Sequence, residues 1–213
     1  MCRLEYLKGL VEQFGCKVTT EEWDRVGEHG VERHVKARTP IYDDVTITDH
    51  VFLISSGIAA SFFNHQNGHV TLTRFFEQGH IATNVDSMLT GDYGSEEVIA
   101  ITDVVGLDFP FGFFFHEYSY GQEFGRFIRL HFIQTLQFDK DLLVCQNLNF
   151  PEARLRFLKT HHSSVMEHAL KKDIAAFLGI TPQAYSRIQR RNGQDDQGPV
   201  ESAPSILPAD RKD

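Results

Sequence analysis

The sequence has 213 residues and lacks paired cysteines, a long apolar run and a signal core. Its three cysteines, Cys2, Cys16 and Cys145, are widely spaced, which argues against a disulfide framework and against a zinc or iron–sulfur site. No apolar run approaches the ~20 residues that a membrane-spanning helix needs. The N-terminal residues alternate charged and apolar side chains, unlike a signal peptide. We expect a globular, cytoplasmic protein without a membrane partner.

Signatures of the common enzyme classes are also absent. The sequence contains no Gly-x-Ser-x-Gly elbow, no phosphate-cradling Gly-Lys loop and no dinucleotide fingerprint. It has 11 histidines, but it has no His-x-His pair, in which one residue separates two histidines on a strand. Metal-binding barrels commonly use such a pair. We expect His65 and His69 to be solvated residues of a hairpin, and His161 and His162 to lie at an exposed helix end. The sequence thus predicts no enzyme, no catalytic residue and no metal site.

Acidic and basic residues are distributed unevenly along the chain. The formal net charge is −8, from 21 Lys and Arg against 29 Asp and Glu. Residues 150–192 hold eight basic and three acidic residues, whereas residues 1–149 hold eleven and twenty-one. Phosphate attracts the basic segment 150–192 and repels the acidic segment 1–149, and this uneven charge helps orient a protein on DNA. Residues 193–213 are rich in Gly, Pro, Ser, Gln and acid, which predicts a disordered tail.

Residues 171–191, KKDIAAFLGITPQAYSRIQRR, have the pattern of two short helices joined by a tight turn. Gly179 follows the first helix, where a positive φ is common and costs least for glycine. Thr181 then offers a hydroxyl to the free N–H groups of the second helix, and Pro182 suits its first position. Tyr185 and Ile188 lie three residues apart on the expected inner face. The pattern predicts a helix-turn-helix.

The opposite face of the second helix consists of hydrogen-bonding side chains. Gln183 and Arg187 lie near its start and are predicted to reach base edges, because an amide suits adenine and a guanidinium suits guanine. Arg190, Arg191 and Lys172 are predicted to contact phosphates. The full predicted DNA-binding set is Lys172, Thr181, Gln183, Ser186, Arg187, Arg190 and Arg191. An ordinary helical hairpin with a solvated charged face is the alternative.

The first 120 residues have the pattern of helices followed by strands. An apolar stripe at helical spacing marks the first helix: Leu4, Leu7, Leu10, Val11 and Phe14. Thr20 is the expected N-cap of a second helix. Beyond Val35, short runs rich in Val, Ile, Phe and Thr alternate with Gly, Asn and Asp turns, and the Asn-Gly pair within residues 65–68 predicts a hairpin. This spacing of turns predicts a sandwich or jelly roll.

A helical period returns at residue 121 and continues to about residue 147, which predicts one long helix. Its repeating positions are Phe124, Phe127, Ile128, His131, Thr135, Phe138 and Leu142. This stripe can pack wholly on the barrel, or part of it can pair with a second copy of the chain as a coiled coil. We favour pairing, because one helix-turn-helix contacts one half of a symmetric DNA site, and a dimer supplies a second helix-turn-helix for the other half. The run FPFGFFF at residues 109–115 fits core or interface packing, with the wall of a ligand pocket as the alternative.

This order of parts resembles the Crp/Fnr superfamily of bacterial transcription regulators along residues 1–192. DHVFLISSGIAASFF at residues 49–63 and TLTRFFEQGHI at residues 71–81 are similar to strands of that family's cyclic-nucleotide domain, and the C-terminal motif is similar to its DNA-reading helices. The resemblance implies an α+β protein. Residues 1–120 would form N-terminal helices and a cyclic-nucleotide-binding-type β jelly roll, and residues 121–147 a long dimerisation helix. Residues 148–192 would form a helix-turn-helix domain that lacks a clear wing.

By the same resemblance, the ligand loop of the barrel corresponds to residues 82–103, ATNVDSMLTGDYGSEEVIAITD. The family holds a cyclic phosphate with a Gly-Glu pair and, near the end of the loop, an arginine, whereas here Thr83 and Asn84 replace the pair and no arginine is present. At the position of the family's arginine and the small residue that follows it, this sequence has either Gly94 and Ser95 or Ser95 and Glu96. Three acidic residues crowd the loop and would repel a phosphate: Asp92, Glu96 and Glu97. We expect Thr83, Asn84 and Ser95 to line any ligand pocket, and a cyclic nucleotide is disfavoured as the ligand.

The sequence therefore predicts a sequence-specific, DNA-binding transcription regulator of Crp/Fnr type, whose barrel senses an effector or serves as a dimerisation platform. Its expected partners are double-stranded DNA with a two-fold symmetric site and a second copy of the chain, with RNA polymerase as a further candidate. The alternative is a cupin-like jelly-roll metal enzyme, or a small-molecule-binding protein, with an unrelated C-terminal helical hairpin.

Overall fold

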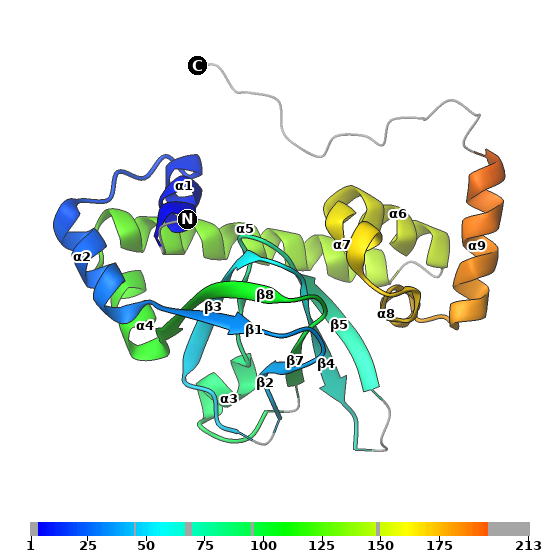
Figure 1. Ribbon diagram of the computed structural model, residues 1–213, viewed down its shortest axis with the longest axis horizontal. Coiled ribbons are helices and arrows are strands. Elements are labelled where there is room, and N and C mark those ends of the chain that lie inside the picture. The colour runs from blue at the N-terminus through cyan, green and yellow to red at the C-terminus, as the bar shows by residue number, and fades with distance from the viewer. Residues whose placement is uncertain (1–3, 45, 67–69, 95, 148–149, 196–213) are drawn as a thin grey trace.

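A long helix connects a β-barrel and two sets of shorter helices in this protein (Figure 1). The computed structural model describes residues 4–44, 46–66, 70–94, 96–147 and 150–195. The long helix runs along one side of the barrel, from the N-terminal helices at one end to the C-terminal helices at the other. The last helix lies at the end of the molecule farthest from the N-terminal helices.

The described strands form two four-stranded antiparallel sheets, with strand orders β1-β8-β3-β6 and β2-β7-β4-β5. The strands are β1 (Val31–Val35), β2 (Pro40–Tyr42), β3 (His50–Ser56), β4 (Ala59–Asn64), β5 (Val70–Phe76), β6 (Ile81–Ala82), β7 (Glu96–Ala100) and β8 (Val104–Pro110), with helix α3 (Val85–Thr90) between β6 and β7. Buried apolar side chains from both sheets, among them Phe52, Ile54 and Phe76, fill the space between them. The expected jelly roll is confirmed.

Two tight connections shape the barrel. β4 and β5 pair antiparallel from Ala59 opposite Phe76 to Asn64 opposite Val70, so the predicted hairpin joins them, although its residues 67–69 lie outside the described part of the chain. Gly57 links β3 to β4 with a φ of 93°. A Cβ atom at Gly57 would lie 2.2 Å from the carbonyl oxygen of Asp103, so glycine is required there for space as well as for conformation.

The N-terminal helices are α1 (Glu5–Gln13) and α2 (Thr20–His29). The predicted cap of α2 was wrong by one residue. Thr19 is the N-cap: its hydroxyl accepts from the backbone N–H of Glu22 at 3.3 Å, and the Glu22 carboxylate accepts from the backbone N–H of Thr19 at 3.1 Å. The start of the barrel was also misplaced, because residues 31–35 form strand β1 and pair with β8 instead of continuing the helical segment.

Helix α4 (Phe111–Tyr120) leads into the long helix α5 (Glu123–Gln146), which starts two residues later than predicted. Phe124, Phe127 and Ile128 of the predicted stripe are buried against the N-terminal helices, α4 and strands β3 and β8. Leu142, near the other end of the stripe, is buried against the C-terminal helices. These four residues of the stripe therefore pack within the chain, and the pairing of this helix with a second copy stays a prediction.

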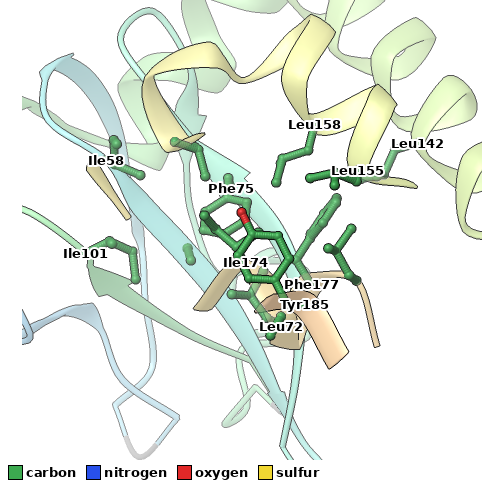
Figure 2. Packing of buried hydrophobic residues seen from close by; sticks show 14 of the residues in the cluster. Ile58, Leu72, Phe75, Ile101, Leu142, Leu155, Leu158, Ile174, Phe177 and Tyr185 are labelled. Atoms are coloured by element: carbon green, nitrogen blue, oxygen red, sulfur yellow. The ribbon is translucent and has the colours of Figure 1, made fainter. Parts of the chain in front are cut away.

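The C-terminal helices are α6 (Pro151–His161), α7 (Ser163–His168), α8 (Lys171–Phe177) and α9 (Pro182–Asp195). Helix α9 continues into the segment predicted as a tail from residue 193, and residues 196–213 lie outside the described part. The C-terminal helices and the barrel share one apolar cluster (Figure 2). Its labelled members are Ile58, Leu72, Phe75 and Ile101 of the barrel, Leu142 of α5, and Leu155, Leu158, Ile174, Phe177 and Tyr185 of the C-terminal helices.

Because this cluster crosses both modules, we predict that they unfold together. Leu158 is 0% exposed within it, so Leu158→Ala should lower the free energy of unfolding by about 2–5 kcal/mol. Differential scanning calorimetry should show one transition for both proteins, at a lower temperature in the variant. Leu170→Ala, at a position that is 49% exposed, is the control and should change stability by less than about 0.5 kcal/mol. Two separate transitions, with only one shifted by Leu158→Ala, would contradict a shared core.

Candidate nucleic-acid interface

The turn between α8 and α9 has the predicted local geometry. Gly179 adopts a φ of 67°, and its N–H donates to the carbonyl of Ala176 at 3.0 Å. The hydroxyl of Thr181 accepts from the backbone N–H of Ala184 at 3.2 Å, which caps α9. Pro182 is the first residue of α9, where its missing N–H costs nothing. The two helices thus form the helix-turn-helix that the sequence predicted.

The inner face of α9 is anchored by two residues that the sequence pattern identified. Tyr185 is 0% exposed and Ile188 is 8% exposed, and both belong to the shared cluster. Ala175 of α8, also buried there, has a side chain small enough to let the two helices cross closely. The Tyr185 hydroxyl accepts a hydrogen bond from the Gln189 side-chain amide at 2.8 Å, and burial raises the pKa of this tyrosine. These contacts determine which side of α9 faces away from the protein.

The predicted DNA-reading side chains lie on that outward side. Gln183, Arg187 and Arg190 are exposed on α9, as is the neighbouring Arg191. Ser186 shares this face but is only half-exposed, and its hydroxyl donates to the carbonyl of Pro182 at 3.0 Å. Lys172 and Thr181 are exposed on α8 and in the turn. We call Gln183, Ser186, Arg187 and Arg190 the polar face of α9.

One basic residue of this segment has a structural role that sequence reasoning missed. Arg154 on α6 donates through Nη1 to the carbonyl of Leu178 at 2.9 Å, and so satisfies a free carbonyl at the end of α8. A Cβ atom at Gly179 would lie 3.0 Å from the same nitrogen. Arg154 is half-buried, whereas the other seven basic residues of this segment are exposed. Its contact crosses 24 residues of chain, so no local pattern could have revealed it.

An ion pair ties α8 to the barrel. Arg38, in the loop between β1 and β2, contacts Asp173 with 2.8 Å between Nη2 and Oδ2, and the Asp173 side chain is only 8% exposed. Arg38 is the one non-glycine residue of the described chain with a positive φ, 67°. That backbone conformation costs roughly 1–2 kcal/mol for a residue with a Cβ. Since the surrounding structure maintains it, the position of this arginine is tightly specified.

A buried polar cluster joins the barrel to the turn between α6 and α7. The Glu77 carboxylate, which follows β5, accepts hydrogen bonds from His162 Nδ1 and from the Ser164 hydroxyl. His162 is 1% exposed, so its predicted place at an exposed helix end was wrong, whereas His161 is exposed as expected. The aromatic ring of Phe138 on α5 lies 5.2 Å from the His162 ring. The seam between the two modules is therefore partly polar.

Two further histidines lie near this seam, the half-buried His80 and the buried His131, and both are held neutral. Burial lowers the pKa of His80 to about 4, and Arg74 and His162 add to the shift while Glu77 opposes it. Burial, together with Arg74, lowers the pKa of His131 to about 4 as well. Burial alone would raise the pKa of Glu77, but its hydrogen bonds from His162 and Ser164 outweigh burial and lower it. The seam thus contains a carboxylate that is stabilised in its charged form and two imidazoles that are stabilised in their neutral form.

Two of the residues predicted to line a ligand pocket in the barrel, Thr83 and Asn84, have hydrogen-bond partners within the protein. Asn84 is 0% exposed: its side chain caps α3 by accepting from the N–H of Ser87 at 3.1 Å and donates to the carbonyl of Glu96 at 2.9 Å. Thr83 is half-buried, and its hydroxyl donates to the carbonyl of His50 at 2.9 Å. Ser95 lies outside the described residues. Both described side chains use their hydrogen-bonding groups on the protein itself.

A second apolar stripe on α5 is exposed, on the side opposite the buried one. Its members are Phe132 (46% exposed), Ile133 (60%), Leu136 (60%), Leu143 (61%) and Val144 (57%). We call this set the exposed α5 stripe. Tyr118 of α4 extends it, because its ring lies 6.0 Å from that of Phe132. Sequence reasoning found the helix but named only its inward face.

Among the described residues, no three or more His, Cys, Asp or Glu side chains are grouped to hold a metal ion. No helix in the described ranges has both the length and the apolar character needed to cross a membrane. Cys16 and Cys145 are free and buried, and burial raises the pKa of both thiols.

The structure is similar to those of several transcription regulators. It matches FixK2 from Bradyrhizobium japonicum with a TM-score of 0.65, at 14% identity, over 82% of this chain and 89% of that chain. It matches CLP, the c-di-GMP responsive global regulator of Xanthomonas campestris, with a TM-score of 0.63, at 11% identity, over 86% and 96% of the two chains. A regulator from Eubacterium rectale that is assigned to the Crp/Fnr family matches with a TM-score of 0.61, at 13% identity, over 86% and 88%.

These similarities show that the chain has the fold of the Crp/Fnr regulators, as the order of its parts had indicated. No protein-family model matches the sequence, and no curated protein matches it either. The similar structures do not favour the alternative of a cupin-like metal enzyme.

The lowered pKa values of His80 and His131 predict a loss of stability in mild acid. Their folded-state pKa of about 4 lies below the value of about 6.5 of a free imidazole, so between these pH values the unfolded chain binds more protons. The free energy of unfolding should therefore fall as the pH decreases from 7 toward 4. In His131→Leu, which removes two ring nitrogens that lack hydrogen-bond partners, the loss between pH 7 and pH 5 should be smaller by roughly 1–2 kcal/mol. Urea titrations at the two pH values measure this, and an equal loss in both proteins would contradict a neutral, buried His131.

Proposed function

We propose that this protein is a sequence-specific, DNA-binding transcription regulator of Crp/Fnr type. The observation that carries the proposal is the arrangement of α9: Tyr185 and Ile188 are buried in the shared core, while Gln183, Arg187 and Arg190 project from the opposite side. A second helix of this kind can enter a major groove, because the groove is wide enough for a helix with its side chains. No catalytic role is proposed for any residue, and cytoplasmic location follows from contact with the chromosome.

We assign different tasks to the side chains near the groove. Gln183 and Arg187 lie in the first half of α9 and would contact base edges, an adenine and a guanine respectively. Arg190, Arg191 and Lys172 would contact phosphates. Thr181 and Ser186 would play smaller parts, because their hydroxyls already bond to the backbone of the same helix.

Charge supports one orientation on the duplex. The exposed basic residues of 150–192 lie at the α9 end of the molecule, whereas residues 1–149 carry the acidic excess. Phosphate repulsion would keep the barrel away from the DNA and favour approach by the C-terminal helices. The affinity should therefore fall steeply with salt concentration.

A dimer would supply two reading heads, and the exposed α5 stripe is the surface we assign to it. The five members of this stripe recur along α5 at the three- and four-residue steps that paired helices use, interrupted by Lys140. A solvated stripe of this length is unusual for a monomer. Two-fold pairing of α5 would place the reading heads on two half-sites in opposite orientation. RNA polymerase remains a candidate partner of such a regulator.

A small-molecule effector is also part of the proposal. CLP is described as c-di-GMP responsive, and another similar structure, with a TM-score of 0.57, is CprK complexed with OCPA, so proteins of this fold respond to different ligands. A cyclic nucleotide is a poor candidate here, because residues 82–103 contain no basic residue to neutralise its phosphate. An effector of any kind must bind more tightly to one arrangement of the two helix-turn-helix units than to the others, since equal binding to all arrangements does not shift the equilibrium between them.

The assignment of Arg187 can be tested by mutation. Arg187→Ala should cost about 1–3 kcal/mol on a duplex that the wild-type protein prefers, and should relax the preference at one base pair. The matched control is Lys172→Ala, which should weaken binding to all duplexes similarly and reduce the salt slope by about 1. Fluorescence anisotropy on preferred and scrambled duplexes measures both. An equal loss on every duplex from Arg187→Ala would reassign this residue to phosphate contacts.

The assignment of the exposed α5 stripe can be tested by charge. Leu136→Glu places a carboxylate in the middle of the stripe and should raise the dimer dissociation constant at least tenfold, because the charge would be buried on pairing. Gln134→Glu adds the same charge at an exposed position outside the stripe and should leave the dimer intact. Analytical ultracentrifugation at micromolar protein concentration distinguishes the two variants by their dimer fraction. A wild-type protein that is monomeric both with and without DNA would contradict this part of the proposal.

A further inference from the structure

The loop between β1 and β2, residues 36–39, is a basic part of the barrel that reaches the helix-turn-helix (Figure 1). It carries Lys36 and Arg38, and all of its residues are exposed. The Arg38 guanidinium contacts α8, because its Nη2 atom lies 2.8 Å from Oδ2 of Asp173. The residue before Asp173 is Lys172, which we assign to a phosphate. This loop of the barrel therefore lies beside a proposed DNA contact.

Cations outnumber carboxylates where the loop meets α8. The exposed cations, which we call the loop patch, are Lys36, Arg38, Lys171 and Lys172. Two carboxylates contact the patch: Asp103 lies 3.1 Å from the Lys36 ammonium, and Asp173 pairs with Arg38. Each carboxylate balances one cation, so an excess of positive charge remains. The charge of this patch is thus opposite in sign to the acidic excess of residues 1–149 as a whole.

The two cations of the loop can accept a second partner. The Arg38 side chain is 38% exposed, and within the described residues Nη2 is its one guanidinium nitrogen that has a partner. An arginine has five N–H donors in a planar arrangement that fits phosphate oxygens. The Lys36 side chain is 83% exposed and that of Asp103 is 65% exposed, so their ion pair is solvated and weak. A phosphate can therefore bind to both cations without displacing a buried contact.

Hydrogen bonds hold the loop in one conformation. The N–H of Arg38 donates to the carbonyl of Ala100 at 2.7 Å, and the N–H of Thr39 donates to the carbonyl of Lys36 at 3.2 Å. Arg38 has a φ of 67°, which glycine would adopt without strain, so this position keeps its arginine at a conformational cost. A loop that is already ordered presents its cations without the entropy loss of ordering a flexible segment on binding.

We propose that this loop contacts the phosphate backbone of the duplex that α9 reads, so that Lys36 and Arg38 extend the DNA-binding surface onto the barrel. The inference rests on the proposed function. Each strand of B-DNA carries a phosphate about every 3.4 Å along the helix axis, so a surface that continues from Lys172 to Arg38 meets neighbouring phosphates. These contacts would add affinity without sequence preference and would orient the barrel on the duplex. The acidic excess elsewhere in residues 1–149 confines the contact to this loop.

The salt dependence of DNA binding tests the proposal, because each lost phosphate contact lowers the slope of log K against log salt by about 0.9. Lys36→Gln should weaken binding to preferred and scrambled duplexes by the same factor, about threefold to tenfold at low salt, and should lower the slope by about 1 per bound subunit. Arg38→Gly should have the same effect on the slope, and it should fold because glycine suits the φ at this position. Fluorescence anisotropy over a salt series measures both variants, and circular dichroism checks their folding.

Lys17→Gln is the matched control. It removes an exposed lysine between α1 and α2, at the end of the molecule farthest from α9, and should bind within about twofold of the wild type with the same slope. Unchanged slopes in both Lys36→Gln and Arg38→Gly, or an equal change in Lys17→Gln, would overturn the proposal and leave DNA reading by α9 intact. A weaker Arg38→Gly with the wild-type slope would assign Arg38 to positioning α8 through Asp173, which also overturns it. A wild-type protein that binds no duplex would refute the proposed function and this inference together.

Discussion

The apolar cluster shared by the barrel and the C-terminal helices determines how these helices are placed on the barrel. It buries Tyr185 and Ile188 of α9 against α8 and, through Ile174 and Phe177, against β5. Because one side of α9 is committed to this core, its polar face must point outward. The orientation of the polar face of α9, which we propose as the DNA-reading surface, is therefore a consequence of packing, and the same side chains determine its direction relative to the barrel.

Polar contacts at the edge of that cluster add specificity to it. The pair between Arg38 and Asp173 and the hydrogen bonds from His162 and Ser164 to Glu77 each join the barrel to a different C-terminal helix. Buried polar groups of this kind contribute little net stability, but they penalise any arrangement that leaves them unpaired. The reading helices therefore have one favoured setting on the barrel, and a change of that setting requires several polar groups to lose their partners together.

Sequence reasoning succeeded for the turn between α8 and α9, where structure depends on neighbouring residues, and it missed the contacts between distant residues that hold the two modules together. Gly179, Thr181 and Pro182 act within a few residues of their own position, so the helix-turn-helix could be predicted. The burial of His162 depends on Glu77, 85 residues away, and no local pattern carries that information. Helix α5 has apolar residues on two faces, and periodicity cannot tell which face meets the barrel. Asn84 was interpreted only by its place in a family's ligand loop, so its local role as the cap of α3 was not predicted.

We propose that the polar face of α9 reads a major groove in a two-fold symmetric complex. Selection of bound sequences from a random duplex pool tests this most directly. We expect an inverted repeat whose half-site centres lie one helical turn apart, about 34 Å, or a multiple of it. Failure of a folded, dimeric protein to enrich any sequence over the starting pool would contradict it.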